Sequence, residues 1–348
     1  MSDPKDPGLK YRDAGVDIDA QDEGLRRIKA MLAATRTKGV LADLGSFGGM
    51  FAPDLAGMRE PVLVASCDGV GTKLKVAFMT GIHNTVGRDL VNHCVNDILV
   101  QGATPLFFLD YVATERLLPS VLASIVEGIA AGCRENGCAL LGGETAEMPG
   151  FYAGGAYDLA GFIVGLVDKP KVIDGRSIQV GDVLYALPSA GLHTNGYSLA
   201  RKIFFELAGK GPGDTVDGLP VTIGAALLAE HRSYLAALRG ALAAGLVRGL
   251  AHITGGGLTD NLPRILPDGT AAMIERGTWP VLPVFSVMSR IGGVADAEMY
   301  RAFNMGVGMV CVIGPEKTAA FEAHLDGAGE KHFRMGAIVP GQRNVIYA

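Results

Sequence analysis

The chain has 348 residues and a formal net charge of −5, and 49 residues are glycine, about twice the usual share of about 7%. Hydrophobic residues make up 49% and charged residues 19%, which excludes a disordered chain and suits about two globular domains. The acidic balance offers no basic field for nucleic acid, and no apolar run reaches the roughly 18 residues of a membrane helix. The N-terminus has no signal-peptide pattern and the five cysteines form no paired framework, so we expect a cytoplasmic protein with reduced thiols.

Residues 1–168 predict one α/β unit, because apolar patterns typical of strands and of helices alternate along them. Strands are expected at 61–66, 105–113, 138–141 and 158–167, and helices at 85–101 and 118–136. Residues 1–60 are rich in loops, with one helical pattern through Leu25, Ile28 and Leu32 and a glycine loop at 44–49.

The polar, proline-containing stretch 168–176 predicts a linker to a second unit at 176–348. A strand is expected at 182–187, and a long alanine- and leucine-rich helix over about 222–244. A glycine turn then opens a short helix that ends near Leu266. The pattern therefore predicts two α/β domains of similar size.

The sequence Asp68-Gly-Val-Gly-Thr-Lys73 directly follows a predicted strand and is the sharpest local pattern. Glycine lets main-chain N–H groups turn toward an anion, an aspartate binds a divalent cation, and a lysine neutralises phosphate. The motif predicts a phosphate site at this strand end, with a solvated turn as the alternative. It has neither the spacing of a Walker A motif nor that of a dinucleotide-binding fingerprint.

Three further acids stand at unusual positions. Asp97 lies on the apolar stripe of the helix predicted at 85–101, where an unpaired carboxylate is costly, unless it bends toward water at the helix end. Asp110 interrupts an apolar strand, and Glu144 follows two glycines after another strand. Carboxylate oxygens are the ligands that Mg²⁺ prefers, so these three acids and Asp68 predict a shared Mg²⁺ and polyphosphate site.

Two glycine-containing loops in the second half, 189–196 and 255–257, each precede a predicted helix. Helix N-termini bind anions such as a sugar phosphate, although glycine also serves helix entry by geometry alone. His193 is singled out because polar loop residues surround it. Four other histidines are interpreted as surface residues: His83, His231, His324 and His332.

These motifs resemble the phosphoribosylformylglycinamidine cyclo-ligase family of purine biosynthesis, and the resemblance runs essentially end to end. The segments that carry it are 11–19, 68–73, 95–98, 102–111, 142–150, 193–198, 254–257 and 298–309. The stretches Gly142-Gly-Glu-Thr-Ala-Glu-Met-Pro-Gly150 and His193-Thr-Asn-Gly-Tyr-Ser198 favour the cyclo-ligases within a wider superfamily. Other members of that superfamily are selenophosphate synthetase, thiamine monophosphate kinase and a hydrogenase maturation factor.

The resemblance implies a two-domain fold of α/β and α+β type. The N-terminal sheets are expected to pair in a homodimer as a barrel-like interface, each backed by an α+β C-terminal domain. ATP and Mg²⁺ are the implied cofactors, and formylglycinamidine ribonucleotide is the implied substrate. ATP would phosphorylate the amide oxygen, and the neighbouring amidine nitrogen would then close the ring with loss of phosphate.

The resemblance also implies roles for individual residues. Part of segment 1–60 is expected to be mobile and to cover the nucleotide. The residues expected to bind ATP are Asp17, Lys29, Gly48, Gly49, Asp68, Gly69, Gly71, Thr72 and Lys73. Those expected at the ribonucleotide are Gly143, His193, Asn195, Gly255, Gly256 and Gly257. Metal ligands are expected at Asp68, Asp97 and Glu144, and catalytic roles at Lys73, Asp110 and His193.

Two other functions stay open from the sequence. One is a superfamily sibling that phosphorylates a small substrate, although the N-terminal cysteine or selenocysteine typical of selenophosphate synthesis is missing, since the first cysteine is Cys67. The other is a non-catalytic nucleotide-binding dimer module, which would not need acids at such positions. The general base for ring closure is also open, with His193 as a candidate.

Overall fold

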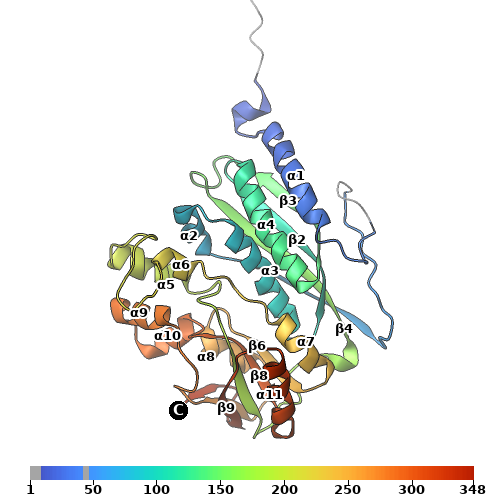
Figure 1. Ribbon diagram of the computed structural model, residues 1–348, viewed down its shortest axis with the longest axis vertical. Helices are drawn as coiled ribbons and strands as arrows, with labels where there is room; N and C mark the ends of the chain where they lie inside the picture. The colour runs from blue at the N-terminus through green and yellow to red at the C-terminus, as the bar shows by residue number, and fades with distance from the viewer. Residues whose placement is uncertain (1–8, 42–46) are drawn as a thin grey trace, which may run out of the picture.

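The computed structural model describes residues 9–41 and 47–348. Two mixed sheets, each with its own helices, form the two halves of the molecule, and the chain ends in the second half (Figure 1). No helix within the described ranges is long and apolar enough to cross a membrane.

The first sheet has four strands in the order β1-β4-β2-β3. They are β1 (Pro61–Gly69), β2 (Thr104–Thr114), β3 (Ala139–Glu147) and β4 (Tyr157–Asp168). β4 is antiparallel to both neighbours, whereas β2 and β3 are parallel. β1 and β3 continue several residues beyond the strands predicted from the sequence, so Asp68 and Glu144 lie within strands and not after them.

Three helices cover one face of this sheet: α1 (Ile18–Ala33), α3 (Asn84–Leu99) and α4 (Pro119–Asn136) (Figure 1). The last two match the helices that the apolar pattern predicts. α3 and α4 approach closely, because a Cβ on Gly128 would collide with the carbonyl oxygen of Asn84. Glycine here allows backbone contact between the two helices.

No described helix covers the opposite face of the first sheet (Figure 1), and exposed apolar side chains lie on it. Alternate residues of β1 turn toward this face, among them Leu63, whose exposed fraction is 65%. Phe162 on β4 is 42% exposed and pairs with Cys67 on one side and Leu109 on the other. An exposed apolar surface of this kind is typical of a protein interface.

The second sheet has six strands in the order β10-β7-β9-β5-β8-β6. They are β5 (Val183–Pro188), β6 (Val247–His252), β7 (Thr270–Ile274), β8 (Val307–Ile313), β9 (Phe333–Pro340) and β10 (Val345–Tyr347). The helices of this half are α5 (Tyr197–Arg201), α6 (Ile223–Leu227), α7 (Leu235–Ala243), α8 (Gly257–Asn261), α9 (Pro283–Gly292), α10 (Asp296–Ala302) and α11 (Thr318–Gly327). Helix α2 (Lys73–Thr80) links β1 to α3.

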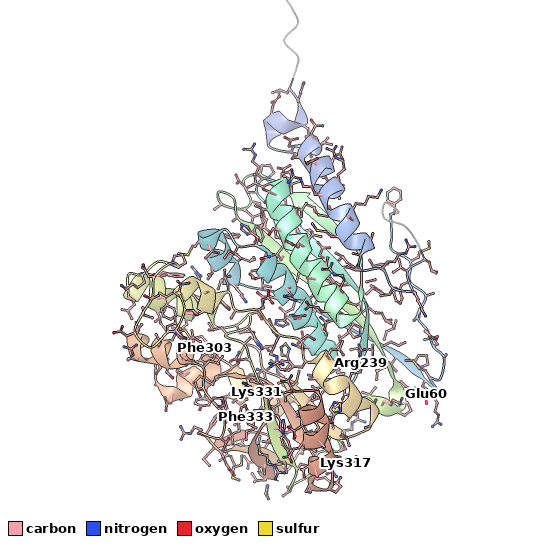
Figure 2. All side chains as sticks on the ribbon, viewed as in Figure 1. Glu60, Arg239, Phe303, Lys317, Lys331 and Phe333 are labelled. Carbon is pink, nitrogen blue, oxygen red and sulfur yellow. The ribbon has the colours of Figure 1, made fainter. Side chains whose placement is uncertain are left out.

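Strand β8 is buried on both faces and divides two apolar cores. Met309 and Cys311 belong to a core that also contains residues of α3 and α4 in the first half. Val310 and Val312 point the other way, into a second core that contains Phe303 (Figure 2). Successive strand residues face opposite sides, so one strand supplies both cores and joins the two halves.

The long helix expected over 222–244 is wrong. α6 and α7 are separate, and the chain between them, 228–234, is not helical. Side chains of α3 bind its backbone: Asp89 accepts a hydrogen bond from the His231 N–H at 2.6 Å, and Asn92 donates one to the His231 carbonyl at 2.8 Å. These bonds replace helical ones, and no local sequence pattern reveals them.

Candidate active site

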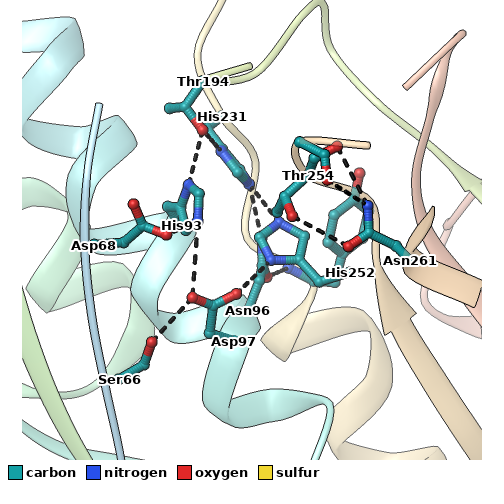
Figure 3. A network of polar contacts seen from close by, with 12 residues as sticks. Ser66, Asp68, His93, Asn96, Asp97, Thr194, His231, His252, Thr254 and Asn261 are labelled. Atoms are coloured by element: carbon teal, nitrogen blue, oxygen red, sulfur yellow. Dashed lines mark hydrogen bonds and ion pairs between the residues drawn. The ribbon is translucent and has the colours of Figure 1, made fainter. Parts of the chain in front are cut away.

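Carboxylates and imidazoles from both halves meet where α3 packs on the second sheet (Figure 3). Nε2 of His93 lies 2.8 Å from Oδ2 of Asp68 and 3.7 Å from Oδ2 of Asp97. Asp97 also accepts hydrogen bonds from Ser66 at 3.0 Å and from Nδ1 of His252 at 2.8 Å. The side chains of Asp68 and Asp97 are 45% and 24% exposed, so this cluster opens to solvent on its acidic side.

Both acids of this cluster are held in the ionised form. Burial works to raise the pKa of Asp68, but the hydrogen bond and charge of His93 outweigh it, and the pKa is lowered. Burial also works to raise the pKa of Asp97, but the hydrogen bond and charge of His252 outweigh it and lower this pKa. Both ionised carboxylates contact the ring of His93, and carboxylate oxygens are the ligands that a divalent cation prefers.

Two more histidines extend the cluster into the protein interior. Nε2 of His231 lies 2.9 Å from Nε2 of His252, and the His193 ring stacks on His231 with centroids 4.1 Å apart. Both His193 and His231 are fully buried. Burial, together with the neighbouring histidines, lowers the pKa of each ring well below its ordinary value, so both are neutral at pH 7.

Of this histidine cluster, the sequence pattern indicates only His193 as a site residue. The interpretation of His231 as a surface residue is wrong, because its exposed fraction is 0%. His93 and His252 were not singled out. The signal for His93 was available, since it stands four residues before Asp97 and therefore shares its helix face. His252 carried no comparable signal, because only the tertiary fold places β6 beside α3.

Lys73 is fully buried at the start of α2. Its Nζ lies 2.6 Å from Oδ2 of Asp89 and donates hydrogen bonds to the carbonyls of His193 at 3.1 Å and Ala229 at 2.8 Å. Two of the three ammonium donors bind these carbonyls, and the Asp89 carboxylate neutralises the charge of Lys73. The Lys73 side chain is enclosed by protein groups here, and its expected phosphate contact stays a prediction.

Three of the expected loops come together beside the histidines. The Thr72 hydroxyl lies 3.2 Å from that of Ser198, which joins the segment 68–73 to the loop at 193–198. A Cβ added to Gly255 would lie 3.2 Å from Oδ1 of Asn195, so these two expected ribonucleotide contacts are neighbours. The fold therefore brings together the segments 68–73, 193–198 and 254–257, which the sequence predicts as separate site segments.

The glycines at 255–257 also have a structural reason. The φ of Gly256 is +94°, and a Cβ on Gly257 would collide with the carbonyl oxygen of Tyr300. Nδ2 of Asn261 donates a hydrogen bond to the Gly257 carbonyl at 2.8 Å. Geometry alone accounts for Gly256 and Gly257, whereas Gly255 has an ordinary φ and faces Asn195.

A separate groove of about 870 Å³ runs between α1 and the strands β2 and β3. Six residues of the predicted site line it: Lys29, Gly48 and Gly49, expected at ATP, Asp110 and Glu144, expected at the metal, and Gly143, expected at the ribonucleotide. Apolar side chains form the rest of its wall: Leu25, Ile28, Leu32, Phe47, Leu109, Val126, Leu141 and Phe162. An apolar groove with a few polar groups is the usual form of a small-molecule site.

Asp110 lies on β2 in this groove, opposite Gly143 of β3. A Cβ on Gly143 would collide with the Asp110 carboxyl group, so this position requires glycine. Burial raises the pKa of Asp110 to about 7. A partly protonated carboxyl group both donates and accepts hydrogen bonds, which suits it to contact a ligand in an apolar groove.

The four acids do not form one site within a single chain. Asp68, Gly161, Asp110 and Gly143 are register partners across the sheet, on β1, β4, β2 and β3 respectively. With strands about 4.8 Å apart, Glu144 lies roughly 14 Å from Asp68. Asp68 and Asp97 therefore lie apart from Glu144, and Glu144, which pairs with Tyr111, faces the side of the sheet opposite to Asp110.

Six of the residues expected to bind ATP do not line this groove: Asp17, Asp68, Gly69, Gly71, Thr72 and Lys73. Asp17 is the N-cap of α1, where its side chain accepts a hydrogen bond from the Ala20 N–H at 3.1 Å. The first part of the glycine loop 44–49, through residue 46, lies outside the described residues. Gly48 and Gly49 are described and line the groove.

Comparison with known proteins gives consistent results over nearly the whole chain. Residues 54–167 match the AIR synthase related protein, N-terminal domain, and residues 179–348 match the AIR synthase related protein, C-terminal domain. A phosphoribosylformylglycinamidine cyclo-ligase of Gloeobacter violaceus is 53% identical over 95% of this chain and 98% of its own length. One from Desulfitobacterium hafniense is 51% identical over 98% and 99%.

Solved structures share the fold at much lower identity. A thiamine-monophosphate kinase from Stenotrophomonas maltophilia has a TM-score of 0.67 and 16% identity, covering 93% of this chain and 95% of its own. The hydrogenase maturation protein HypE in complex with ATP has a TM-score of 0.63 and 19% identity, covering 92% and 90%. With both domains matched and relatives more than 50% identical over nearly the full length, the chain belongs to the AIR synthase related family.

Proposed function

We infer that this chain catalyses the ATP-dependent cyclisation of formylglycinamidine ribonucleotide to 5-aminoimidazole ribonucleotide, with release of ADP and phosphate. The observation that carries this inference is the identity of 50% to 53% with cyclo-ligases over at least 95% of both chains. The likeness to a thiamine-monophosphate kinase has 16% identity and concerns the fold alone. Phosphorylation of a different small substrate is therefore the weaker alternative.

The chemistry determines what the site must supply. An amide oxygen is a poor leaving group, so transfer of the γ-phosphoryl group of ATP to that oxygen, with departure of ADP, comes first. The amidine nitrogen then attacks the same carbon, the carbon–oxygen bond breaks, and phosphate leaves as a base takes the proton. Catalysis of such steps depends on positioning the groups and neutralising phosphate charge.

We place ATP in the groove between α1 and strands β2 and β3. Its apolar wall suits a purine base, and its volume of about 870 Å³ accommodates a nucleotide. Lys29 is the lysine in the groove wall and would contact a phosphate, with Gly48 and Gly49 allowing close approach. For Asp17, which caps α1, we propose an indirect role in holding that helix.

We place the ribonucleotide beside the loops at 193–196 and 255–257. The adjacency of Asn195 and Gly255 supports this, as does the opening of the acidic cluster next to them. The proton acceptor for ring closure is proposed to be a neutral imidazole of the histidine cluster. His193 is the candidate, because its Nδ1 has no hydrogen-bond partner among the described residues.

Mg²⁺ suits the carboxylates of Asp68 and Asp97, which are ionised, partly exposed and both in contact with His93. When bound, the ion would neutralise phosphate charge. Glu144 can join these two acids only from another chain or after a rearrangement, because it lies on the opposite edge of the sheet.

We propose that the protein is a homodimer that pairs the apolar faces of its first sheets. The exposed Leu63 and Phe162 support this, since water otherwise contacts them. A paired arrangement would also give Glu144 a route to the acids of a second copy. We further propose a cytoplasmic location, in line with its five free cysteines.

One assay tests the reaction. The full-length protein is mixed with ATP, Mg²⁺ and formylglycinamidine ribonucleotide, and both ADP and aminoimidazole ribonucleotide are quantified. We expect one ADP for each imidazole formed. ATP loss that is independent of the ribonucleotide, or formation of a phosphorylated but uncyclised product, would contradict the proposal.

A further inference from the structure

Helix α2 and helix α3 bury an ion pair against the second half of the chain. Nζ of Lys73 lies 2.6 Å from Oδ2 of Asp89, and both side chains are 0% exposed. Burial lowers the pKa of Lys73 and raises that of Asp89, and the attraction between the two charges opposes both shifts. Such a pair is costly to bury and is matched or surpassed in stability by apolar side chains, so its retention calls for another reason.

The remaining hydrogen bonds of the pair supply that reason. Lys73 donates to the carbonyls of His193 and Ala229, and Asp89 accepts from the N–H of His231 at 2.6 Å. The pair therefore binds the backbone of two loops that are 36 to 38 positions apart in sequence, as the numbering of 193, 229 and 231 shows. Apolar side chains of the same size would fill the space but could not bind these backbone groups.

His193 needs such support because its backbone conformation is unfavourable. Its φ is +61°, in the left-handed region that side chains other than glycine rarely adopt. Lys73 and the hydroxyl of Tyr197, which lies 3.0 Å away, both bind the carbonyl of this residue. Residues held in this region persist only where the surroundings fix them, and such positions concentrate at functional sites.

We propose that Lys73 and Asp89 are positioning residues that fix the His193 and His231 loops, and thereby the ribonucleotide side of the active site. This rests on the proposed function, in which the 193–196 loop faces the ribonucleotide. In this role neither residue touches ATP. Lys73, the lysine of the motif at 68–73, positions the loops at the ribonucleotide site and does not bind the phosphates of ATP.

The alternative, a direct phosphate contact by Lys73, makes a different prediction for Asp89. If Lys73 binds a phosphate of ATP, its removal weakens ATP binding, whereas substitution of its buried partner Asp89 does not weaken it to the same extent. A positioning pair gives the same defect from either partner. The comparison of Lys73→Met with Asp89→Asn therefore separates the two roles.

The test uses the full-length protein, once wild-type turnover of ATP and formylglycinamidine ribonucleotide is established. Absence of that turnover would refute the proposed function itself, before any variant is compared. For Lys73→Met and Asp89→Asn, we expect kcat/KM for the ribonucleotide to fall at least 100-fold. The Kd for Mg²⁺–ATP, measured by calorimetry, should stay within 3-fold. Lys75→Met is the matched control, because Lys75 lies on the same helix with an exposed side chain, and both constants should be unchanged.

A single substitution leaves one buried charge without a partner, so the double variant Lys73→Met/Asp89→Leu is measured as well. It has no orphaned charge and is expected to fold, as circular dichroism and thermal unfolding would report. It should keep the loss in ribonucleotide kcat/KM, because the backbone contacts remain absent. Wild-type kinetics in the folded double variant would overturn the proposal. A rise of 10-fold or more in the ATP Kd for Lys73→Met, with Asp89→Asn unchanged, would overturn it too.

Discussion

Nδ1 of His252 lies 2.8 Å from Oδ1 of Asp97, across 155 positions of sequence. The contact joins the end of β6 in the second half to α3 in the first. It orients a carboxylate that we propose as a metal ligand, and it lowers the pKa of that carboxylate. The acidic cluster is therefore complete only when the two halves are packed together.

The charge of Asp97 is expected to be essential for turnover. Asp97→Asn keeps the size of the side chain and an oxygen that accepts the hydrogen bond from His252, so the fold should persist. We expect kcat to fall at least about 100-fold, since catalysis of phosphoryl transfer depends on charge neutralisation. Steady-state assays over a range of Mg²⁺ concentrations check this. Asp268→Asn is the control, because that side chain is 95% exposed, and equal kcat in both variants would contradict the role.

The groove predicts a nucleotide-specific effect at Lys29. Loss of a charged hydrogen bond costs about 1.5 to 3 kcal/mol, so Lys29→Met should raise the KM for ATP by about 10- to 150-fold. The KM for the ribonucleotide should change little, because that substrate is placed elsewhere. Lys38→Met, at an exposed residue after α1, serves as the control. A variant with a normal KM for ATP would exclude this groove wall as the phosphate site.

Asp110 predicts a pH-dependent change in stability. Its pKa is about 7 in the folded chain and about 3.9 in an unfolded chain. Between those values the folded state binds more protons, so stability falls as the pH rises from about 4 to 7, and the loss is complete above pH 7. Asp110→Asn removes this loss and should raise the free energy of unfolding at pH 8, by at most about 4 kcal/mol. Urea unfolding of both proteins at pH 8 and pH 5 measures this gain in the free energy of unfolding. A gain that is no larger at pH 8 than at pH 5 would contradict the raised pKa of Asp110.

Two neighbouring glycines offer a matched comparison on β3. A Cβ on Gly143 would collide with the Asp110 carboxyl group, whereas one on Gly142 would lie 3.7 Å from Cδ2 of Leu109, an ordinary contact. We expect Gly143→Ala to lower the free energy of unfolding by about 1 to 3 kcal/mol and Gly142→Ala to leave it nearly unchanged. Thermal and urea unfolding of both variants test this. Equal losses in the free energy of unfolding for the two variants would show that the contact with Asp110 does not determine the effect of alanine.

If the uncovered face of the first sheet forms the homodimer interface, a charge placed on that face should prevent dimerisation. Leu63→Glu places a carboxylate in the proposed dimer interface and should dissociate the dimer into folded monomers. Sedimentation velocity gives the mass in solution. Leu207→Glu is the control, because Leu207 is 64% exposed in the second half, close to the 65% of Leu63. A wild-type protein that is monomeric at micromolar concentration would exclude the interface at once.

The sequence alone identified the elements whose signals are local. The apolar patterns predicted α3, α4, β2 and β4 to within about two residues, because periodic burial is present in each segment, whereas β1 and β3 extend three and six residues beyond their predicted ends. The motifs at 68–73, 193–198 and 254–257 were recognised one by one, and their resemblance to cyclo-ligases agreed with the family to which the chain belongs.

Only the tertiary structure decided how those segments serve each other. The helical pattern over 222–244 was overridden because Asp89, some 140 positions away, binds the N–H of His231. His231, which has no local signal for burial, is buried where its N–H meets Asp89. Lys73 of the motif at 68–73 also points inward and forms an ion pair with Asp89. Hydrogen bonds between distant segments satisfy backbone groups that a local pattern assigns to a helix, and this is why the sequence identified the motifs but not their partners.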